Sequence, residues 1–210
     1  MPRTAITAAT RPTIHPDACV AETATVSGDV TIGRGSVVLD RAVVVAESAP
    51  VRIGEECIVM EHAVVRGAGA HPAMIGSRVL VGPHTHVTGA AIGDDSLVAT
   101  HASVFNGAEL GAGSLVAIGA IVHVMTRLPP GGRVPMLNIA VGDPAEIFPP
   151  DRADEAHARV ETIGFTKAVF GHDTADMPFR EAMAWLCGTY SRALRARAAA
   201  MSRAGEEHSA

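Results

Sequence analysis

The chain has 210 residues and a formal net charge of −5, and aromatic residues make up only 3% of it. This length is enough for one domain with a sizeable core, and an acidic balance without a basic run argues against nucleic acid and anionic membranes as partners. The first residues lack the apolar core of a signal peptide, and no stretch approaches a membrane span, so we expect a cytoplasmic protein without membrane contact.

An aliphatic residue recurs at nearly every sixth position from Val20 to Val122. Neither the helical period of 3.6 residues nor strand alternation produces this spacing, whereas a hexapeptide-repeat solenoid does, with three hexads in each triangular coil. A valine-rich β-sandwich would instead need a turn signal every ~8 to 12 residues. The fifth position of the hexads, which we expect to point inward near a corner, holds small residues: Ala42, Cys57, Ala63, Thr85, Ser96, Ala102, Ala108, Ser114 and Ala120.

The six-residue period breaks at three places. Three residues are inserted between Val44 and Ile53, four are inserted between Val65 and Ile75, and one is missing between Val87 and Ile92. The last two breaks flank a cluster of histidines. We therefore expect the functional site to lie there.

The end of the chain differs from the repeat. Proline- and glycine-rich segments at 128–132 and 142–151 mark the change, and helical patterns follow, one from Asp154 to about Phe170 and one from Pro178 onward, with fraying expected from about Ala199. In the second helix, apolar residues recur every three or four positions: Phe179, Met183, Leu186, Tyr190 and Leu194. We predict a β-helix domain over residues 1–148, with repeats at about 20–127, and a helical extension over 149–210 packed on it.

Several segments resemble the gamma class of carbonic anhydrases over residues 15–148. They read HPDACVAETATVSGDVTIG, PVRIGEECIVMEHAVVRG, IGSRVLVGPHTHVTGAAIGDD and VGDPAE. The resemblance implies an all-β solenoid in the form of a left-handed parallel β-helix, a homotrimer, and a metal site at each subunit interface. The left hand follows from this resemblance alone, because crossovers between parallel strands are generally right-handed.

The metal ligands of that family are replaced in this chain. The three zinc histidines fall on Arg66, Pro83 and Thr88, and the family's structural arginine and aspartate fall on Val45 and Glu47. Arg66 would place a permanent cation at the metal position, where it would repel zinc. A conventional zinc-dependent CO2 hydratase is therefore not expected.

Nearby histidines suggest a relocated site for zinc or another divalent metal. His62, His84 and His101 occupy equivalent hexad positions in successive coils, which lie roughly 4.8 Å apart. The metal-ligand candidates are His84 and His86, with His62, His71 or His101, and a second subunit could complete the set. The alternative is that these are solvated corner histidines or interface residues.

A metal-free site is a further possibility. Arg66 could hold an anion or stabilise an oxyanion, and His84 or His86 could act as general acid or base. Glu61 could orient an imidazole, pair with Arg66, or simply hold subunits together. The catalytic candidates are His84, His86, Arg66 and Glu61, and the substrate-binding candidates are Arg66, Thr88 and Met60.

Three functions therefore remain open. We favour a gamma-carbonic-anhydrase-like homotrimer whose remodelled interface site, lyase- or hydrolase-like, acts on a small anionic or carbonyl substrate. The first alternative is a hexapeptide acyltransferase using a coenzyme A thioester, with His84, His86, His101 or His123 as base, although Glu146 stands where relatives often carry lysine. The second is a catalytically inactive trimeric assembly protein, which complete loss of the metal ligands would explain.

Overall fold

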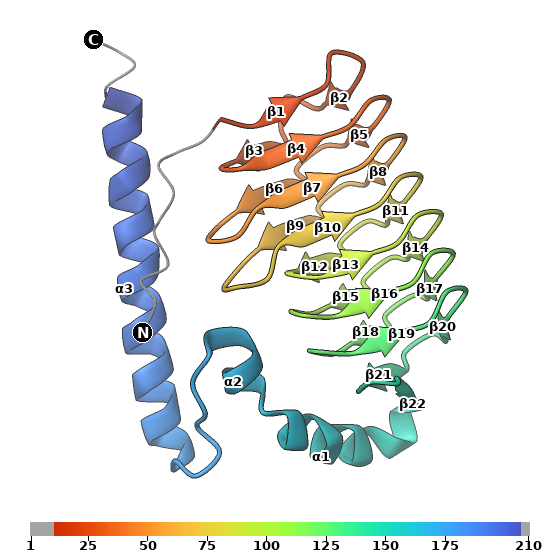
Figure 1. The fold of residues 1–210 in the computed structure, drawn as a ribbon, viewed down its shortest axis with the longest axis vertical. Helices are drawn as coiled ribbons and strands as arrows, with labels where there is room; N and C mark the ends of the chain where they lie inside the picture. The colour runs from red at the N-terminus through yellow and green to blue at the C-terminus, as the bar shows by residue number, and fades with distance from the viewer. Residues whose placement is uncertain (1–10, 207–210) are drawn as a thin grey trace.

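The computed structural model of the protein describes residues 11–206, which form a three-sided prism of short parallel strands followed by helices (Figure 1). Sheet A contains β1 (Thr13–Ile14), β4 (Val30–Ile32), β7 (Val51–Ile53), β10 (Ala73–Ile75), β13 (Ala91–Ile92), β16 (Glu109–Leu110) and β19 (Arg127–Leu128). Sheet B contains β2 (Cys19–Val20), β5 (Val37–Val38), β8 (Ile58–Val59), β11 (Leu80–Val81), β14 (Leu97–Val98), β17 (Leu115–Val116) and β20 (Arg133–Val134). Sheet C contains β3 (Thr25–Ser27), β6 (Val43–Ala46), β9 (Val64–Gly67), β12 (His86–Thr88), β15 (Ser103–Val104), β18 (Ile121–Val122), β21 (Ile139–Val141) and the antiparallel β22 (Glu146–Phe148).

Each coil contributes one strand to each sheet, so the chain is an all-β solenoid of about seven coils that matches a left-handed β-helix. The fold predicted from the six-residue period and the family resemblance is confirmed. The coils run from Thr13 to Val141 and so extend beyond the predicted repeats at both ends. In the part of the chain from 11 to 206, none of the helices has both the length and the apolar character that crossing a membrane requires.

The interior of the prism is a column of aliphatic side chains. Val65, Val81, Val87 and Val98 are fully buried, and their counterparts from the second coil onward are buried too. The small residues predicted to point inward at the corners are buried as well, from Ala42 to Ala120. The prism is therefore too narrow for aromatic rings in its core, which is consistent with the scarcity of aromatics within the repeat.

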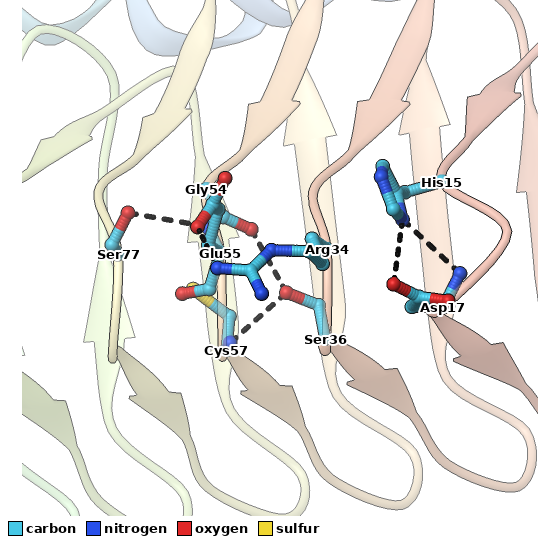
Figure 2. Close-up of polar contacts among 8 residues, drawn as sticks. All are labelled: His15, Asp17, Arg34, Ser36, Gly54, Glu55, Cys57 and Ser77. Atoms are coloured by element: carbon cyan, nitrogen blue, oxygen red, sulfur yellow. Dashed lines mark hydrogen bonds and ion pairs between the residues drawn. The ribbon is translucent and has the colours of Figure 1, made fainter.

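Polar side chains join neighbouring coils at the corner between sheets A and B (Figure 2). The Ser36 hydroxyl donates to the Gly54 carbonyl at 2.8 Å and accepts the Cys57 N–H at 3.0 Å, and Ser77 accepts the Glu55 N–H in the next coil. Burial raises the pKa of the Cys57 thiol above its usual value. Cys57 is thus a buried, unreactive thiol, as its inward position predicts.

Several corners adopt left-handed backbone that non-glycine residues rarely use. His62, His84 and His101 have φ of 59°, 56° and 57°, and Gly119 holds the equivalent position in the next coil with φ 65°. Backbone hydrogen bonds from each of these residues to the coil before it accompany this geometry. The left-handed backbone costs free energy at each of these residues, and the stacking of the coils maintains it.

The insertions lengthen the first part of sheet C. Residues 47–49 lie against the Gly67 carbonyl, which accepts their backbone N–H groups. A side chain at Gly67 would overlap the Ala49 carbonyl, so glycine is required by this close approach. In the four-residue insertion, Ala68 and His71 pair as an isolated antiparallel β-bridge. Both insertions therefore lie at the edge where sheet C turns toward sheet A, called the C–A corner below.

The helical extension begins where the coils end. A short 3-10 turn, η1 (Pro150–Arg152), leads into α1 (Ala153–Ile163), which packs Ala156 and Val160 on Val141 and Phe148 and so covers the last coil. Gly164, with φ 76°, separates α1 from α2 (Phe165–Phe170). The long α3 (Phe179–Glu206) then runs back along the stack with its C-terminal end toward β1 (Figure 1), and it continues past Ala199, where we expected fraying.

Candidate functional site

The candidate site lies on the outer side of sheet C around Arg66, the residue on which the family resemblance predicts the first zinc histidine to fall. Arg66 is in β9, Glu47 follows β6, and Tyr190 comes from α3. The Arg66 guanidinium forms a hydrogen-bonded ion pair with Glu47 and donates to the Tyr190 hydroxyl at 2.7 Å, and that hydroxyl lies 3.0 Å from Glu47 Oε1. The three side chains are hydrogen-bonded to one another, and they join α3 to the second and third coils.

In this cluster, the cost of burying the Arg66 charge is offset by the neighbouring Glu47 carboxylate. Burial alone would lower the pKa of Arg66, but the neighbouring Glu47 carboxylate and the Tyr190 hydroxyl raise it above its usual value. Burial and the Glu47 charge raise the pKa of Tyr190. The arginine is therefore always charged and the tyrosine neutral near pH 7, and Glu47 neutralises the cation that we predicted would hold a substrate anion.

His86 and Thr88 lie beside this cluster on β12. Thr88 is the register partner of Arg66, and its hydroxyl is 2.7 Å from His86 Nε2. Burial, and then the Arg66 charge, lower the pKa of His86 below its usual value. His86 is thus a neutral imidazole near pH 7, within hydrogen-bond reach of the hydroxyl of Thr88, a residue that is only 7% exposed.

A chain of rings continues from His86 over sheet C to the helices. Successive rings lie 5.6 to 6.5 Å apart between centroids, in the order His86, Phe105, His123, Phe165, Phe170 and Tyr190. The outer face of sheet C is therefore covered by aromatic side chains of α2 and α3. The sequence pattern predicted that the second helix packs on the prism but did not single out Tyr190 as part of the site.

The three corner histidines form an exposed stack on the corner between sheets B and C, called the B–C corner. The rings of His62 and His84 are 4.8 Å apart and inclined by 5°, and those of His84 and His101 are 5.0 Å apart and inclined by 16°. This spacing is the one that counting hexads predicts. Because the rings are parallel, their nitrogens do not converge on one point between them.

A zinc ion does not fit the family positions of this chain. The guanidinium of Arg66 has no lone pair and is already paired, Pro83 has no side-chain donor, and the Thr88 hydroxyl is bonded to His86. Within residues 11–206 of one chain, no three His, Cys, Asp or Glu side chains are arranged to hold a metal ion. A relocated site shared between copies stays a prediction.

The other predicted site residues lie apart from Arg66. His71 Nε2 is 3.0 Å from the Ala168 carbonyl and so holds α2. Glu61 lies at the B–C corner, at the other end of the β9 strand, and Arg66 pairs with Glu47 instead. Met60 is half-buried on sheet B. One chain thus brings together Arg66, His86 and Thr88, but not Glu61, Met60 or the histidine stack.

A shallow, largely apolar groove of about 500 Å³ crosses the outer face of sheet A from β10 to β19. Arg127 lies in it and forms ion pairs with Glu109 at 3.0 Å and Asp143 at 3.5 Å. A cation shared by two carboxylates is poorly placed to bind the phosphates of coenzyme A. This groove therefore does not strengthen the acyltransferase alternative.

Curated proteins with similar sequences include carbonic anhydrase relatives, while no protein-family model matches the chain. Mitochondrial gamma carbonic anhydrase 1 of Arabidopsis thaliana is 30% identical over 126 residues, which are 57% of this chain and 46% of that protein. Carboxysome assembly protein CcmM of Synechococcus elongatus is 35% identical over 136 residues, 59% of this chain and 25% of that protein. The matched region spans about half or less of these relatives' lengths.

Solved structures share the fold. A Bacillus cereus protein described as a candidate acetyltransferase has a TM-score of 0.56 and 25% identity, with 71% of this chain and 86% of that chain covered. A hexapeptide transferase family protein from Anaplasma phagocytophilum, at 23% identity and a TM-score of 0.55, covers 65% of this chain and shows the fold alone. Together with the coil geometry, the similarities in sequence and in structure support a gamma-carbonic-anhydrase-like protein with the hexapeptide-repeat fold.

Proposed function

We propose that this protein is a homotrimeric, gamma-carbonic-anhydrase-like assembly protein that does not hydrate CO2 with zinc. The observation that carries the proposal is the pairing of Arg66, at the former metal position, with Glu47 and Tyr190. A catalytic zinc needs three protein ligands and an open coordination position. Here Arg66 bonds to Glu47 and Tyr190 and so ties α3 to the prism. Pro83 has no side-chain donor, and the Thr88 hydroxyl lies within hydrogen-bond distance of His86, so these positions do not present three ligands to a metal.

The outer face of sheet B supports self-association. One column of this face consists of aliphatic residues in register over five coils: Val37, Ile58, Leu80, Leu97 and Leu115. Ile58 and Leu97 remain 38% and 37% exposed. An apolar strip of this length is typical of a surface covered by another subunit, and the trimeric arrangement comes from the family resemblance.

The assembly role is favoured over our first expectation, a site for a small anionic substrate, because Glu47 already neutralises Arg66. The similarity to a carboxysome assembly protein agrees with a role in assembly, although that relative is four times as long as the region matched.

A second candidate function rests on His86 and Thr88. A neutral imidazole 2.7 Å from a hydroxyl is the arrangement in which a base activates a nucleophile for attack on a carbonyl carbon. The aromatic cover of sheet C would exclude water from such a step. This reaction would be metal-free and would suit a small ester or other carbonyl substrate.

Metal content, mass and CO2 hydration of the tag-free protein test the main proposal together. We expect the protein to sediment as a trimer and to contain well under one metal ion per chain. After zinc is added, we expect no CO2 hydration above the rate in buffer alone. The Arg66→His/Pro83→His/Thr88→His variant is the control and is expected to gain zinc affinity. About one ion per chain that is lost in His84→Ala/His86→Ala would instead establish the relocated metal site.

Hydrolysis of small chromogenic esters tests the second candidate. We expect no activity above buffer if the protein is an assembly protein. Turnover that is abolished in both His86→Asn and Thr88→Val, but retained in the exposed-stack variant His101→Asn, would favour the metal-free enzyme and overturn the assembly role.

A further inference from the structure

The three corners of the prism carry different side chains. The C–A corner is covered by α2, which His71 holds through a backbone carbonyl. The corner between sheets A and B, called the A–B corner, carries charged side chains in each of its first five coils. Two exposed ion pairs lie there, Arg34 with Glu55 (Figure 2) and Arg78 with Asp95. Neither of these two corners offers uncharged and uncovered surface to a partner.

The B–C corner changes from charged to apolar along the prism. Charged residues occupy its turns in the first three coils: Glu22, Asp40, Arg41 and Glu61. The turns of the last four coils contain no Asp, Glu, Lys or Arg and consist of Pro83 and His84, Thr100 and His101, Ile118 and Gly119, and Met136 and Leu137. Ile118 is 50% exposed, and Met136 and Leu137 are each 63% exposed. One chain by itself therefore leaves three large apolar side chains of this corner in water.

The two faces that meet at the B–C corner are uncharged beside it. On sheet B, the column nearest the corner holds one apolar or small residue in each of five coils: Leu39, Met60, Gly82, Ala99 and Ala117. On sheet C, the nearest column holds in the same five coils Val43, Val64, His86, Ser103 and Ile121. Sheet A differs, because Arg52 and Arg127 lie on it in ion pairs with acidic residues. A strip of uncharged surface thus runs along each side of the B–C corner.

The size of the sheet B side chains changes at the same level as the corner. Beside the charged turns of the second and third coils, the strip holds the large Leu39 and Met60. Beside the uncharged turns of the next three coils, it holds Gly82, Ala99 and Ala117. The strip is therefore lowest at the levels where the corner is free of carboxylates and guanidinium groups, and it leaves room there for a second chain.

Threefold symmetry limits how three-sided prisms can meet. An axis along the prism turns one copy into the next by a third of a full turn, which is also the angle between neighbouring faces of the prism. The faces of all three copies then point in the same three directions, so no face lies flat on a face of the next copy. A corner of one copy points instead at a face of the next, and in each copy that corner and that face adjoin. The rotation also keeps every coil at its own level.

Of the three corners, the B–C corner is the one that is exposed and has uncharged surface on both sides. We propose that three copies associate with their B–C corners around a common threefold axis, and that the last four turns of each corner are buried against an adjoining strip of the next copy. Both adjoining strips are uncharged, so the corner is covered by apolar or small side chains whichever way the ring turns. The contact is heterologous and closes a ring of three. It rests on the proposed self-association and identifies a second copy as what covers Ile118 and Met136.

Thiol cross-linking tests which corner lies at the axis. In a Cys19→Ser/Cys187→Ser background, the remaining Cys57 is buried. His84→Cys places one thiol on the B–C corner, and the matched control Arg78→Cys places one at the same hexad position of the same coil on the A–B corner. We expect bismaleimides to join two of the three chains into covalent dimers in the His84→Cys variant and to give none in the control.

Insertion of a charge tests whether the apolar turns are covered. Ile118→Arg would bury a cation without a partner, so we expect it to weaken association at least ~tenfold in sedimentation. Ala112 is exposed at the same hexad position of the same coil on the A–B corner, so Ala112→Arg should associate like the wild type. Circular dichroism of both variants shows whether the coils remain folded.

The outcomes separate this contact from the proposed function. A trimer that cross-links only through Arg78→Cys, or through neither thiol, would overturn the B–C contact, and so would a trimer that Ile118→Arg leaves intact. Each of these results would leave the proposed assembly function standing, whereas a monomeric wild type would overturn both.

Discussion

The prism and the C-terminal helix α3 are held in place in different ways. Every coil of the prism stacks on its neighbours through backbone hydrogen bonds in three sheets and buries its inward aliphatic residues. Helix α3 stands along the prism and is joined to sheet C by Tyr190, which bonds to Arg66 and Glu47 and packs on Phe170. The position of α3 therefore depends on a few side chains, while that of each strand depends on a continuous ladder.

This difference predicts different stabilities. In a solenoid the free energy of unfolding is approximately a sum over coils and their interfaces. A helix attached by few contacts opens at a lower free energy than the coils beneath it. Substitutions in the two regions should separate global unfolding from release of α3.

The largest effect is expected from a charge inside the prism. Val98 is fully buried, so Val98→Asp should cost more than ~4 kcal/mol and leave the chain unfolded or aggregated, because the carboxylate has no partner there. Met74 points outward on sheet A and is 43% exposed, so Met74→Asp should keep the fold. Circular dichroism and urea unfolding distinguish the two, and equal loss in both variants would contradict the inward–outward assignment.

Removal of Arg66 should release α3 and leave the coils folded. The Glu47 side chain is only 11% exposed, so Arg66→Ala strands a largely buried carboxylate. We expect a loss of about 2 to 3 kcal/mol, at the low end for a broken buried pair because Arg66 is partly exposed. Hydrogen exchange should increase in α3 and not in β9. Equal acceleration in both would show that α3 is not an independent unit.

Tyr190→Phe is the milder form of the same test. It removes one hydroxyl and keeps the ring against Phe170, so we expect a loss of about 1 kcal/mol and a smaller increase in α3 exchange. A loss as large as that of Arg66→Ala would mean that the hydroxyl, rather than the ion pair, holds the helix.

The pH dependence of stability tests the burial of His86. Its pKa is lowered in the folded protein by burial and by Arg66, so the unfolded chain binds more protons as the pH falls. The contribution of His86 is thus fully present above the ordinary histidine pKa of about 6.5 and is lost progressively below it. His86→Asn should flatten the stability curve between about pH 7 and pH 5. His123, whose pKa is lowered first by burial and then by His157, should retain a similar slope in that variant.

The smallest effect is expected at the histidine stack. His84 is exposed and has φ 56°, and Gly119 occupies the same turn position in a later coil. His84→Gly should therefore be more stable than His84→Ala by about 1 kcal/mol, because alanine resists left-handed backbone. Thermal unfolding of the two variants measures the difference, and the reverse order would show that ring stacking outweighs backbone strain.

Much of the prism and part of the site could be predicted from residue order. The six-residue period predicted which residues point inward, and counting hexads predicted that His62, His84 and His101 form one column. These predictions succeed because a stacked coil relates positions by a nearly constant repeat length. The alignment that places Arg66 at the former metal position and Glu47 at the structural aspartate stays a prediction.

Contacts that cross from the repeat to the helices could not be predicted in this way. Arg66 and Tyr190 are 124 positions apart, and no period relates them. Glu61 was one candidate partner for Arg66, whereas Glu47, 19 positions away from Arg66, had been placed only at the family's structural aspartate. The insertion after Ala46 decided between them by carrying Glu47 to the C–A corner beside Arg66.

Residue order alone was therefore enough for the solenoid, its inward and outward faces, and the column of corner histidines, since these depend on local repetition and on residue identity. Tertiary structure decided that Arg66 is neutralised, that His86 is a neutral imidazole beside Thr88, and where α3 lies along the stack. The physical reason is that charge state and burial depend on which distant side chains share the same space, and a repeat period carries no information about that.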